Sequence, residues 1–440
     1  MNLITSSSKG RKWFSLPLLI PLVLIIVIGL ITLYSTLILP TGGLGDTSIL
    51  IKQIAFIGVG IILFLILSYI DLSYLKTWQV QLVIYGITIA LLIAVLIFGP
   101  VIKGVQRWLV IGGVQIQPSE IAKVAVIVLT AFIFSQKKKY NEWILFVVSL
   151  LLTIPIFFLI YKEPSGSMAF MTLGIWFIIA FLGLNNPLRN TTLLLIIAST
   201  VGAFLIPSIT GNNSWYFLLI PAVVIAIFGF YAKNNWKAFI AIAMVLGLLV
   251  GFLSSFTWSR VLKPYQKNRI VAFINPEETT DDIGFNVNQS KIAIGSGQII
   301  GKGFGNGTQS KRSFLPEFRT DFIFASFAEE FGLVGAVFLI SLYAIIIVIC
   351  FLAAINSSAD PMLSLLSVGI GIKILFEVFI NVGTNTGGIP ATGIPLPLMS
   401  AGGTVTIMTM VELGILHNII LKNEQKIRTE NADIINVYED

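Results

Sequence analysis

Charged residues, cysteine and histidine are all scarce in this sequence. Only 11% of its 440 residues are charged, against about 25% in an average soluble protein, which argues against a soluble globular fold. A single cysteine, Cys350, allows no disulfide within the chain. With one histidine, His417, the sequence offers no Cys/His zinc cluster. No metal site is therefore predicted, no cofactor is evident, and a need for a divalent cation stays open.

Long apolar runs take the place of the missing charge. Hydrophobic residues make up 56% of the chain, and runs of about 18–25 residues are long enough to cross a hydrocarbon core of roughly 30 Å. The alternating segments of a membrane β-barrel are absent. We therefore predict an all-α, polytopic transmembrane helical bundle with about twelve spans. The predicted spans are 16–39, 51–70, 80–101, 119–135, 143–161, 167–184, 191–209, 214–231, 238–257, 325–354, 362–382 and 399–421.

Basic residues in the short loops predict the orientation of these spans. They lie at Lys76, 137–139, Arg189 and 233–237, whereas the short loops 40–49 and 210–213 carry none. Because cytoplasmic loops are enriched in Lys and Arg, the N-terminal tail, 1–15, and the C-terminal tail, 422–440, are both expected in the cytoplasm. The remaining segments are spans one to nine in 16–257, a large extracellular or periplasmic loop in 258–324, and spans ten to twelve in 325–421.

Part of the net charge of +7 falls on outer segments. Residues 102–118 include Arg107, and residues 258–322 carry nine basic residues, among them Lys263 and Arg269. Long translocated loops do not follow the charge rule, so these residues either solvate the loop or bind a polyanionic head group. Charge alone leaves both interpretations open. Nucleic acid is not an expected partner, because most Lys and Arg lie in short loops.

An interfacial anchor and a helix start stand close together in segment 104–126. Arg107 and Trp108 suit the interfacial belt of a membrane protein. Gly112 and Gly113 then permit a tight turn. Gln117-Pro118-Ser119-Glu120 indicates a helix start, with Pro and an acid in the first turn. Lys123 follows Glu120 at i+3, so the two can pair on one helix face. The segment either contributes to a site or serves only as an anchor with a structural ion pair.

Polar residues also recur inside the eleventh predicted span. Lys373, Glu377 and Asn381 are spaced every four residues and form one stripe, which must face the protein interior or a wet cavity. A structural pair of Lys373 with Glu377 is the favoured interpretation. Glu412, in the last span, is either a partner of Lys373 or a channel group. The following segment, 381–406, is rich in Gly and Pro, and such backbone must be buried in protein or line a cavity.

Asp321 lies where the large polar loop meets the tenth predicted span. An acid there is either a helix-start residue that the macrodipole favours or a functional group at the edge of the membrane. The preceding segment, 291–311, is expected to be a Gly-rich loop and lacks the spacing of a P-loop. Glu329 and Glu330, two turns further on, are expected near the interface.

Several segments in this order resemble the SEDS family of membrane glycosyltransferases, the RodA/FtsW proteins of shape, elongation and division. They are RWLVIGGVQIQPSEIAK, KPYQKNRI, NQSKIAIGSG, GKGFGNGTQ, FLPEFRTDFIFASFAEEFGLVG and GGIPATGIPLPLMSAGG. They cover most of the chain and are more similar to the elongation (RodA) branch than to the division branch. The family's essential acid, in the motif PExxTDF, falls on Asp321.

The resemblance implies a peptidoglycan glycosyltransferase that polymerises lipid II into glycan strands at the outer face of the cytoplasmic membrane, for cell elongation and shape. It also implies a class B penicillin-binding protein as transpeptidase partner, together with other membrane proteins of the elongation complex. The family motifs and the outer basic residues supply the candidate substrate-binding residues. These are Arg107, Trp108, Gln117, Glu120, Lys123, Lys263, Arg269, Glu317, Thr320 and Ser400.

The sequence departs from the family pattern at four places. The usual QPDLGT stands here as residues 163–167, EPSGS, one residue short and without the Asp. The usual SYGGS stands as SAGGT from Ser400, and Glu377 occupies a position where Gln is common. The family commonly has ten spans, so an extra pair is expected within 191–257. These departures bear on local substrate contacts more than on the fold.

The expected chemistry follows from the residue types. A carboxylate can take the proton of a sugar 4-hydroxyl as general base, a role assigned to Asp321. Positive charge must stabilise the leaving pyrophosphate, for which Arg107, Lys123, Lys263 and Arg269 are candidates. A lipid II flippase and a non-catalytic scaffold of the cell-wall complex are the alternatives. A flippase needs polar groups along its whole path, whereas a polymerase needs them at the outer end.

Overall fold

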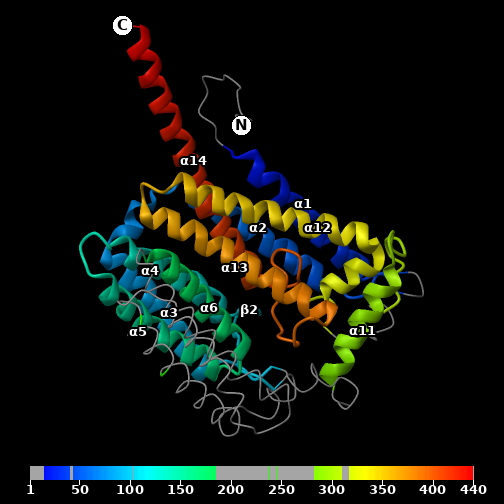
Figure 1. The fold of residues 1–440 in the computed structure, drawn as a ribbon. Helices are drawn as coiled ribbons and strands as arrows, with labels where there is room; N and C mark the ends of the chain where they lie inside the picture. Colours follow the sequence, from blue (N-terminus) through cyan, green and yellow to red (C-terminus); the bar gives the residue numbers. More distant parts are fainter. Residues whose placement is uncertain are drawn as a thin grey trace. The chain divides into compact units, whose positions relative to one another are not determined.

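The computed structural model describes residues 14–39, 43–102, 104–184, 237, 245, 282–309 and 317–439. Within these residues, nine helices are long and apolar enough to cross a membrane, and each overlaps one predicted span. They are α1 (Leu16–Ser35), α2 (Ser48–Tyr69), α3 (Trp78–Phe98), α4 (Pro118–Ser135), α5 (Glu142–Lys162), α6 (Gly166–Gly183), α12 (Ile323–Asn356), α13 (Pro361–Thr386) and α14 (Gly403–Glu439) (Figure 1). The predicted all-α membrane fold is thereby confirmed. The predicted spans 191–209, 214–231 and 238–257 fall outside the described residues, apart from Val245.

Several of these helices begin where the sequence carries a start signal. Pro118 and Pro361 open α4 and α13, where the missing N–H of proline costs nothing because the first helical N–H groups have no partner within the helix. The side chain of Asn141 accepts from the N–H of Trp143 at 2.9 Å and so caps α5. Asp360 caps α13 in the same way. Local sequence therefore determines these boundaries.

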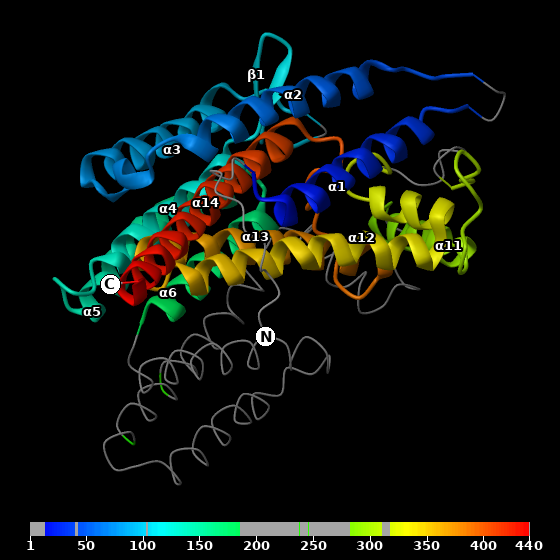
Figure 2. The same cartoon turned by 90° about the horizontal axis from the view of Figure 1, so that it is seen from above.

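The helices differ in how deeply they lie within the bundle. In the most apolar stretch of α4, 83% of the residues are buried, compared with 22% in α2 and in α3. The corresponding share is 72% in both α13 and α14. Figure 2 shows α14 running between α2 and the pair α12 and α13. The polar residues of α4, α13 and α14 are thus placed at the centre, while α2 and α3 present apolar side chains outward.

Small residues allow α14 and α2 to approach closely. A Cβ built on Gly414 of α14 would lie 2.8 Å from the carbonyl oxygen of Phe64 in α2, closer than a real Cβ can come. Glycine is therefore required at this crossing, as is common where membrane helices pack backbone to backbone.

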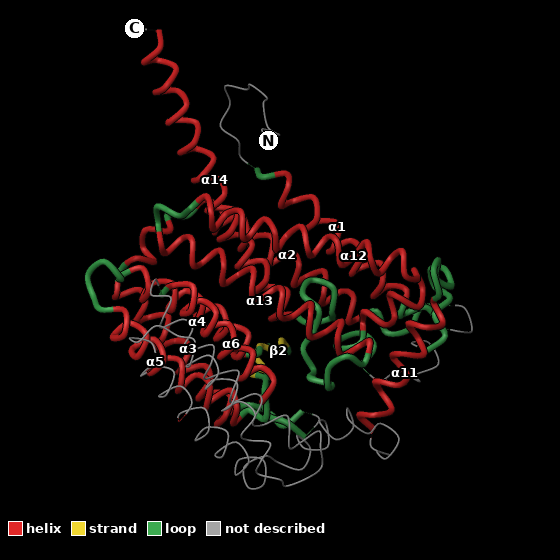
Figure 3. Tube along the Cα trace, viewed as in Figure 1, coloured by secondary structure: helices red, strands yellow, loops and turns green. Residues whose placement is uncertain are grey.

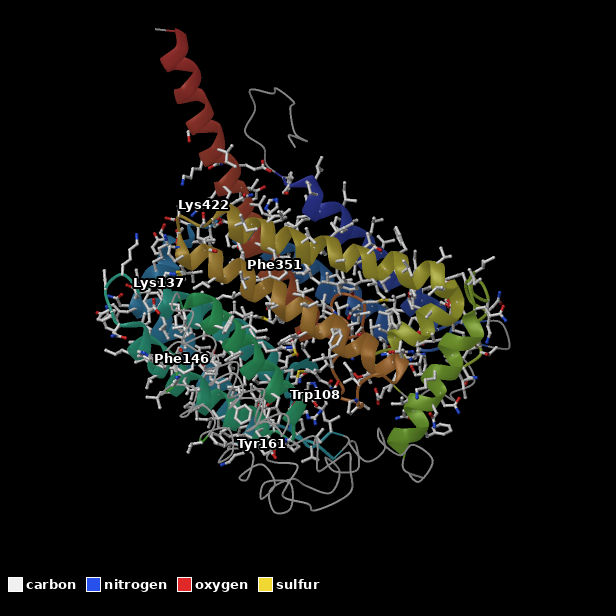
Figure 4. The ribbon with its side chains drawn as sticks, in the orientation of Figure 1. Trp108, Lys137, Phe146, Tyr161, Phe351 and Lys422 are labelled. Carbon is white, nitrogen blue, oxygen red and sulfur yellow. The ribbon has the colours of Figure 1, made fainter. Side chains whose placement is uncertain are left out.

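The two ends of the bundle carry different residues. The N–H of Ser15, before α1, donates to Nε2 of His417 in α14 at 3.1 Å, so the start of α1 lies beside the middle of α14. Figure 4 places Lys137 and Lys422 toward one end and Trp108 and Tyr161 toward the other. Ion pairs also gather at the first end, where Lys422 pairs with Asp71 at 3.1 Å. The 3-10 helix η1 (Leu72–Lys76) lies at this end too.

The segment predicted as one large outer loop contains a helix. Helix α11 (Asp282–Gly297) includes the first residues of the predicted Gly-rich loop 291–311, so that prediction was wrong for 291–297. Val287, Ala293 and Ile294 of this helix pack with Phe322 and Ala325. This packing outweighs the two glycines in 291–297, of which Gly297 ends the helix. Helix α14 likewise continues to Glu439, well beyond the predicted end of the last span.

A short hairpin precedes α4. Strand β1 (Leu109–Ile111) pairs antiparallel with β2 (Val114–Ile116). Between them, Gly112 and Gly113 have φ values of 59° and 79°, which is the conformation that a two-residue hairpin turn demands. The predicted tight turn is present, although strands were not predicted. Figure 3 shows the strands in yellow, near the label β2, and the loops in green.

Candidate active site

Asp321 lies in a turn that ends just before α12. The main-chain N–H groups of Thr320 and Phe322 donate to the carbonyl of Glu317 at 3.1 and 3.2 Å. The hydroxyl of Thr320 donates to the Glu317 carboxylate at 3.1 Å. Glu317 has a φ of 52°, a left-handed conformation that is uncommon for a residue with a Cβ. The predicted residues Glu317 and Thr320 thus build the turn that carries the half-buried Asp321.

Two asparagines of α13 contact the main chain of Asp321. Nδ2 of Asn381 donates to the Asp321 carbonyl at 2.9 Å and to the carbonyl of Ile394 at 2.8 Å. Nδ2 of Asn385, one helical turn later, donates to the same Asp321 carbonyl at 3.0 Å. Both asparagines are buried, and hydrogen bonds shielded from water are stronger than exposed ones. The turn is therefore tied to α13.

The Gly/Pro-rich segment after α13 contacts the same turn from the other side. The hydroxyl of Ser400 accepts from the N–H of Leu396 at 2.8 Å and donates to the Thr320 carbonyl at 2.6 Å. The N–H of Ala401 donates to the carbonyl of Arg319 at 2.8 Å. The predicted residue Ser400 hence joins this segment, the orange loop that follows α13 in Figure 1, to the turn.

The carboxylate of Asp321 faces the backbone of this Gly/Pro-rich segment. A Cβ built on Gly393 would lie 3.4 Å from Oδ2 of Asp321, and Gly393 has a φ of 72°. A residue without a side chain leaves the backbone accessible to a second molecule. The Asp321 carboxylate therefore lies against glycine backbone, close enough that a side chain at position 393 would contact it.

Gln53 of α2 supports the segment from behind, although the sequence gave no reason to choose it. Its Nε2 donates to the Ser400 carbonyl at 3.3 Å and to the hydroxyl of Thr406 at 2.9 Å. Its Oε1 accepts from the N–H of Gly402 at 3.2 Å. A lone amide in an apolar span was the available signal, because a buried polar group needs partners.

The predicted intramembrane charges form one buried cluster between α4, α13 and α14. Nζ of Lys123 lies 2.8 Å from Glu120 and 2.6 Å from Glu377. Nζ of Lys373 lies 2.9 Å from Glu412 and 3.4 Å from Glu377. All five side chains are 0% or 1% exposed. The structure thus makes Glu412 a partner of Lys373, and Lys123 could reach a pyrophosphate only if the cluster opened.

Arg107 contacts the altered motif at residues 163–167. Its guanidinium donates to the carbonyls of Glu163, at 3.3 Å, and Pro164. The Glu163 carboxyl is fully buried, and neither of its oxygens has a hydrogen-bond partner among the described residues. Burial raises the pKa of Glu163 to about 8, against the opposing charge of Arg107. Trp108 is half-buried beside Arg107.

The main chain of Gln117, not its side chain, makes the contact that links α4 to α14. Its N–H donates to the hydroxyl of Thr404 at 3.0 Å, and this hydroxyl lies 3.4 Å from the Gln115 carbonyl. The start of α4 is thereby tied to the start of α14.

The Gly-rich segment 298–309 packs on an interruption in α12. Gly332 has φ 64° and ψ −165° and breaks the helix. The N–H groups of Lys302 and Gly303 donate to the carbonyls of Glu329 and Glu330 at 3.0 and 2.9 Å. The Glu329 carboxylate also accepts from Nζ of Lys302 at 2.6 Å. Both glutamates are buried beneath this segment, which satisfies carbonyls that the break in the helix leaves free.

The structure therefore gathers some predicted residues around Asp321 and leaves others apart. Glu317, Thr320, Ser400 and Asn381 contact the turn directly. Lys263 and Arg269 lie outside the described residues. Asn385 was missed, although it continues the predicted stripe of α13 by one further step of four residues.

Comparison with known proteins identifies the family. A model of the FtsW/RodA/SpoVE family, described as "Cell cycle protein", matches residues 16–210 and 210–425. The chain belongs to this family. Peptidoglycan glycosyltransferase MrdB of Escherichia coli K12 is 31% identical over 416 residues, which cover 94% of this chain and 97% of MrdB. Peptidoglycan glycosyltransferase RodA of Treponema pallidum is 31% identical over 434 residues, which cover 93% and 98%.

These relatives confirm the predicted SEDS family and the predicted enzyme class. Two solved structures show the same fold. A chain of a peptidoglycan synthase complex that coordinates polymerization and crosslinking matches with a TM-score of 0.65 and 23% identity, covering 94% of this chain and 99% of that one. RodA of Thermus thermophilus matches with a TM-score of 0.57 and 22% identity, covering 93% and 97%.

Proposed function

We propose that this chain polymerises lipid II into glycan strands at the outer face of the cytoplasmic membrane, with Asp321 as general base. The observation that carries the proposal is the setting of Asp321. Its main chain is held by two asparagines, while its half-buried carboxylate faces the bare backbone at Gly393. A general base needs a fixed position and an accessible oxygen within reach of the proton that it takes.

The reaction assigns the proton and both electron pairs. The 4-hydroxyl oxygen of one sugar forms a bond to the anomeric carbon of another, and its proton passes to the Asp321 carboxylate. The bond from that carbon to the pyrophosphate oxygen breaks, and the oxygen keeps the electron pair. One inverting attack on an α-linked donor gives a β-linked glycan. Arg107, Lys263 and Arg269 are proposed to stabilise the leaving pyrophosphate, because positive charge there lowers the barrier.

The other candidate residues are proposed to shape the site. Glu317, Thr320 and Ser400 hold the turn that carries Asp321, as their hydrogen bonds indicate. Trp108 and Gln117 are proposed to line the outer approach. Glu120 and Lys123 belong to the buried cluster and would act on substrate only through its rearrangement.

We further propose the elongation branch, a class B penicillin-binding protein as transpeptidase partner and contacts with other elongation-complex membrane proteins. Both termini are proposed to be cytoplasmic. The short basic loops support this orientation, as does the shared end of the bundle at which Lys137 and Lys422 lie (Figure 4). The proposed segments are the tails 1–15 and 422–440, the outer loop 258–324 and spans in 16–257 and 325–421.

A flippase is less well supported than a polymerase. Transport of a charged head group requires polar groups along the path. Lys373, Glu377 and Glu412 instead pair with one another and are 0% or 1% exposed.

The test is polymerisation of labelled lipid II by the purified protein together with its class B partner. Wild type is expected to make glycan chains, and Asp321→Asn is expected to lose at least about 10²-fold in rate. Asp71→Asn is the matched control, because Asp71 is exposed, accepts from the N–H of Ser73 at 3.0 Å and lies at the end of the bundle that carries Lys422. Chains from Asp321→Asn at the wild-type rate would remove Asp321 as base. Lipid II carried across vesicles with no chain formation would favour the flippase.

A further inference from the structure

We propose that Asn385 is a positioning residue, which fixes Asp321 relative to the first turn of α12 and so sets the direction of the catalytic carboxylate. This inference rests on the proposed role of Asp321 as general base. Asn385 is fully buried, so it acts through Asp321 and does not touch substrate itself.

The side-chain amide nitrogen of Asn385 forms the first arm of the contact. Nδ2 donates to the Asp321 carbonyl at 3.0 Å and to the Asn381 carbonyl at 2.9 Å. Nδ2 of Asn381 donates to the same Asp321 carbonyl at 2.9 Å. One carbonyl oxygen thus receives two amide donors, which uses both of its lone pairs. The peptide plane after Asp321 is therefore held from two points on α13.

The side-chain amide oxygen forms the second arm. Oδ1 of Asn385 accepts from the N–H of Ala325 at 3.1 Å. Ala325 belongs to the first turn of α12, and its N–H is shared between this amide oxygen and the carbonyl of Phe322, also at 3.1 Å. Only one orientation of the amide suits both arms, because the nitrogen must face a carbonyl and the oxygen must face an N–H. Asn385 therefore spans the junction between the catalytic turn and α12.

Helix α11 contacts the same residue. The hydroxyl of Ser290 donates to the main-chain carbonyl of Asn385 at 2.8 Å, and Ser290 is buried. Helix α11, helix α13 and the junction between the Asp321 turn and α12 thus meet at one residue, Asn385. In Figure 1 the end of α13 lies beside α11 and the start of α12.

The consequence is kinetic. Loss of Asn385 leaves Asn381 as the remaining amide donor to the Asp321 carbonyl, and the turn gains freedom to rotate. A displacement of about 1 Å at a catalytic group costs on the order of 10²-fold in rate. Substrate binding depends on other surfaces, so the loss should fall on kcat and leave KM nearly unchanged.

The experiment compares two variants of Asn385 with a matched asparagine elsewhere. Asn385→Leu removes both arms at similar volume. Asn385→Asp keeps an acceptor for the Ala325 N–H and loses the donor to the Asp321 carbonyl. The control is Asn418→Leu, since the buried Asn418 also donates to two main-chain carbonyls, those of Leu67 at 2.9 Å and Ile70 at 2.7 Å.

Rates are measured with lipid II and the class B partner, per mole of folded protein as judged by size-exclusion chromatography. Both Asn385 variants are expected to lose at least about tenfold in kcat, with KM changed less than about threefold. Asn418→Leu is expected to keep kcat within about twofold of wild type, even if its melting temperature falls as much as that of the Asn385 variants. If Asn385→Leu does not fold, Asn385→Asp decides alone, because it retains the bond to α12.

Three results would overturn the assignment: a kcat of folded Asn385→Asp within about twofold of wild type, a loss confined to KM, or an equal loss in Asn418→Leu. Asp321→Asn, measured in parallel, separates this failure from failure of the proposed function. If that variant is as active as wild type, the base itself is misassigned. If it is inactive while the Asn385 variants are fully active, only the positioning role is wrong.

Discussion

Replacement of Lys373 by methionine tests whether the buried cluster stabilises the fold through its charge balance. The cluster holds three carboxylates and two ammonium groups, so its formal charge is −1 when all are ionised. Lys373→Met leaves three carboxylates with Lys123 alone, a formal charge of −2. Glu412 then loses Lys373, the cation with which it forms an ion pair in the cluster.

The magnitude follows from the distances. At an effective dielectric constant of about 20, charges 2.9 Å apart, as for Lys373 and Glu412, attract by roughly 6 kcal/mol. Desolvation of the ammonium group offsets part of this attraction, and methionine packs well in its place. Removal of one partner from a buried pair typically costs about 3–5 kcal/mol, which we expect for Lys373→Met.

Two matched variants separate the effect of charge from the effect of packing. Glu412→Gln leaves two carboxylates and two ammonium groups, with Lys373 still 3.4 Å from Glu377, and is expected to change stability by less than about 1 kcal/mol. The double variant Lys373→Met/Glu412→Gln restores the charge of −1 and should recover most of the loss. Stability is measured as the melting temperature in detergent, from loss of the monodisperse peak in size-exclusion chromatography.

Two outcomes would refute this reasoning about charge. One is a Lys373→Met variant as stable as wild type, which would mean that the remaining carboxylates take up protons at little cost. The other is a double variant no more stable than Lys373→Met, which would make the loss one of packing.

Two further predictions concern Glu163 and the Gly-rich segment 298–309. The pKa of Glu163 is raised in the folded state from 4.5 to about 8, so the folded protein holds this proton more tightly than the unfolded chain and loses stability as the pH rises from about 4.5 through about 8. Glu163→Gln should therefore melt on the order of 3 °C or more above wild type at pH 8.5 and close to it at pH 4.5; equal differences at both pH values would contradict this. Gly301→Ala should lower the melting temperature more than Gly303→Ala. Both glycines have nearly the same φ, +90° and +91°, so the backbone strain of the two substitutions is matched. A new Cβ would lie 2.1 Å from the carbonyl oxygen of Glu330 at position 301, whereas at position 303 it would lie 3.3 Å from the side chain of Asn306. Similar melting temperatures would show that the close contact relaxes freely.

Much of the fold could be predicted from local sequence. Apolar runs long enough to cross a bilayer predicted the nine described spans, and Pro118 marked the start of α4. The Gly112-Gly113 pair predicted its turn. These features depend on residues a few positions apart. The helix in 291–297 was missed because two glycines suggested a loop, although tertiary packing of the buried Ala293 favours helix there.

The sequence by itself determined the membrane class, the candidate acid Asp321 and the stripe of α13. These depend on composition, on a motif at the junction of a polar loop with an apolar run, and on a spacing of four residues. Only the tertiary structure decided which charges pair, since Lys123 and Glu377 are 254 positions apart and yet lie 2.6 Å from each other. The same holds for Gln53 and Asn385, whose partners come from distant segments. A polar side chain in an apolar span indicates that it has a hydrogen-bond or ion-pair partner, because burial without one is costly. Only the packing of the helices determines which residue that partner is.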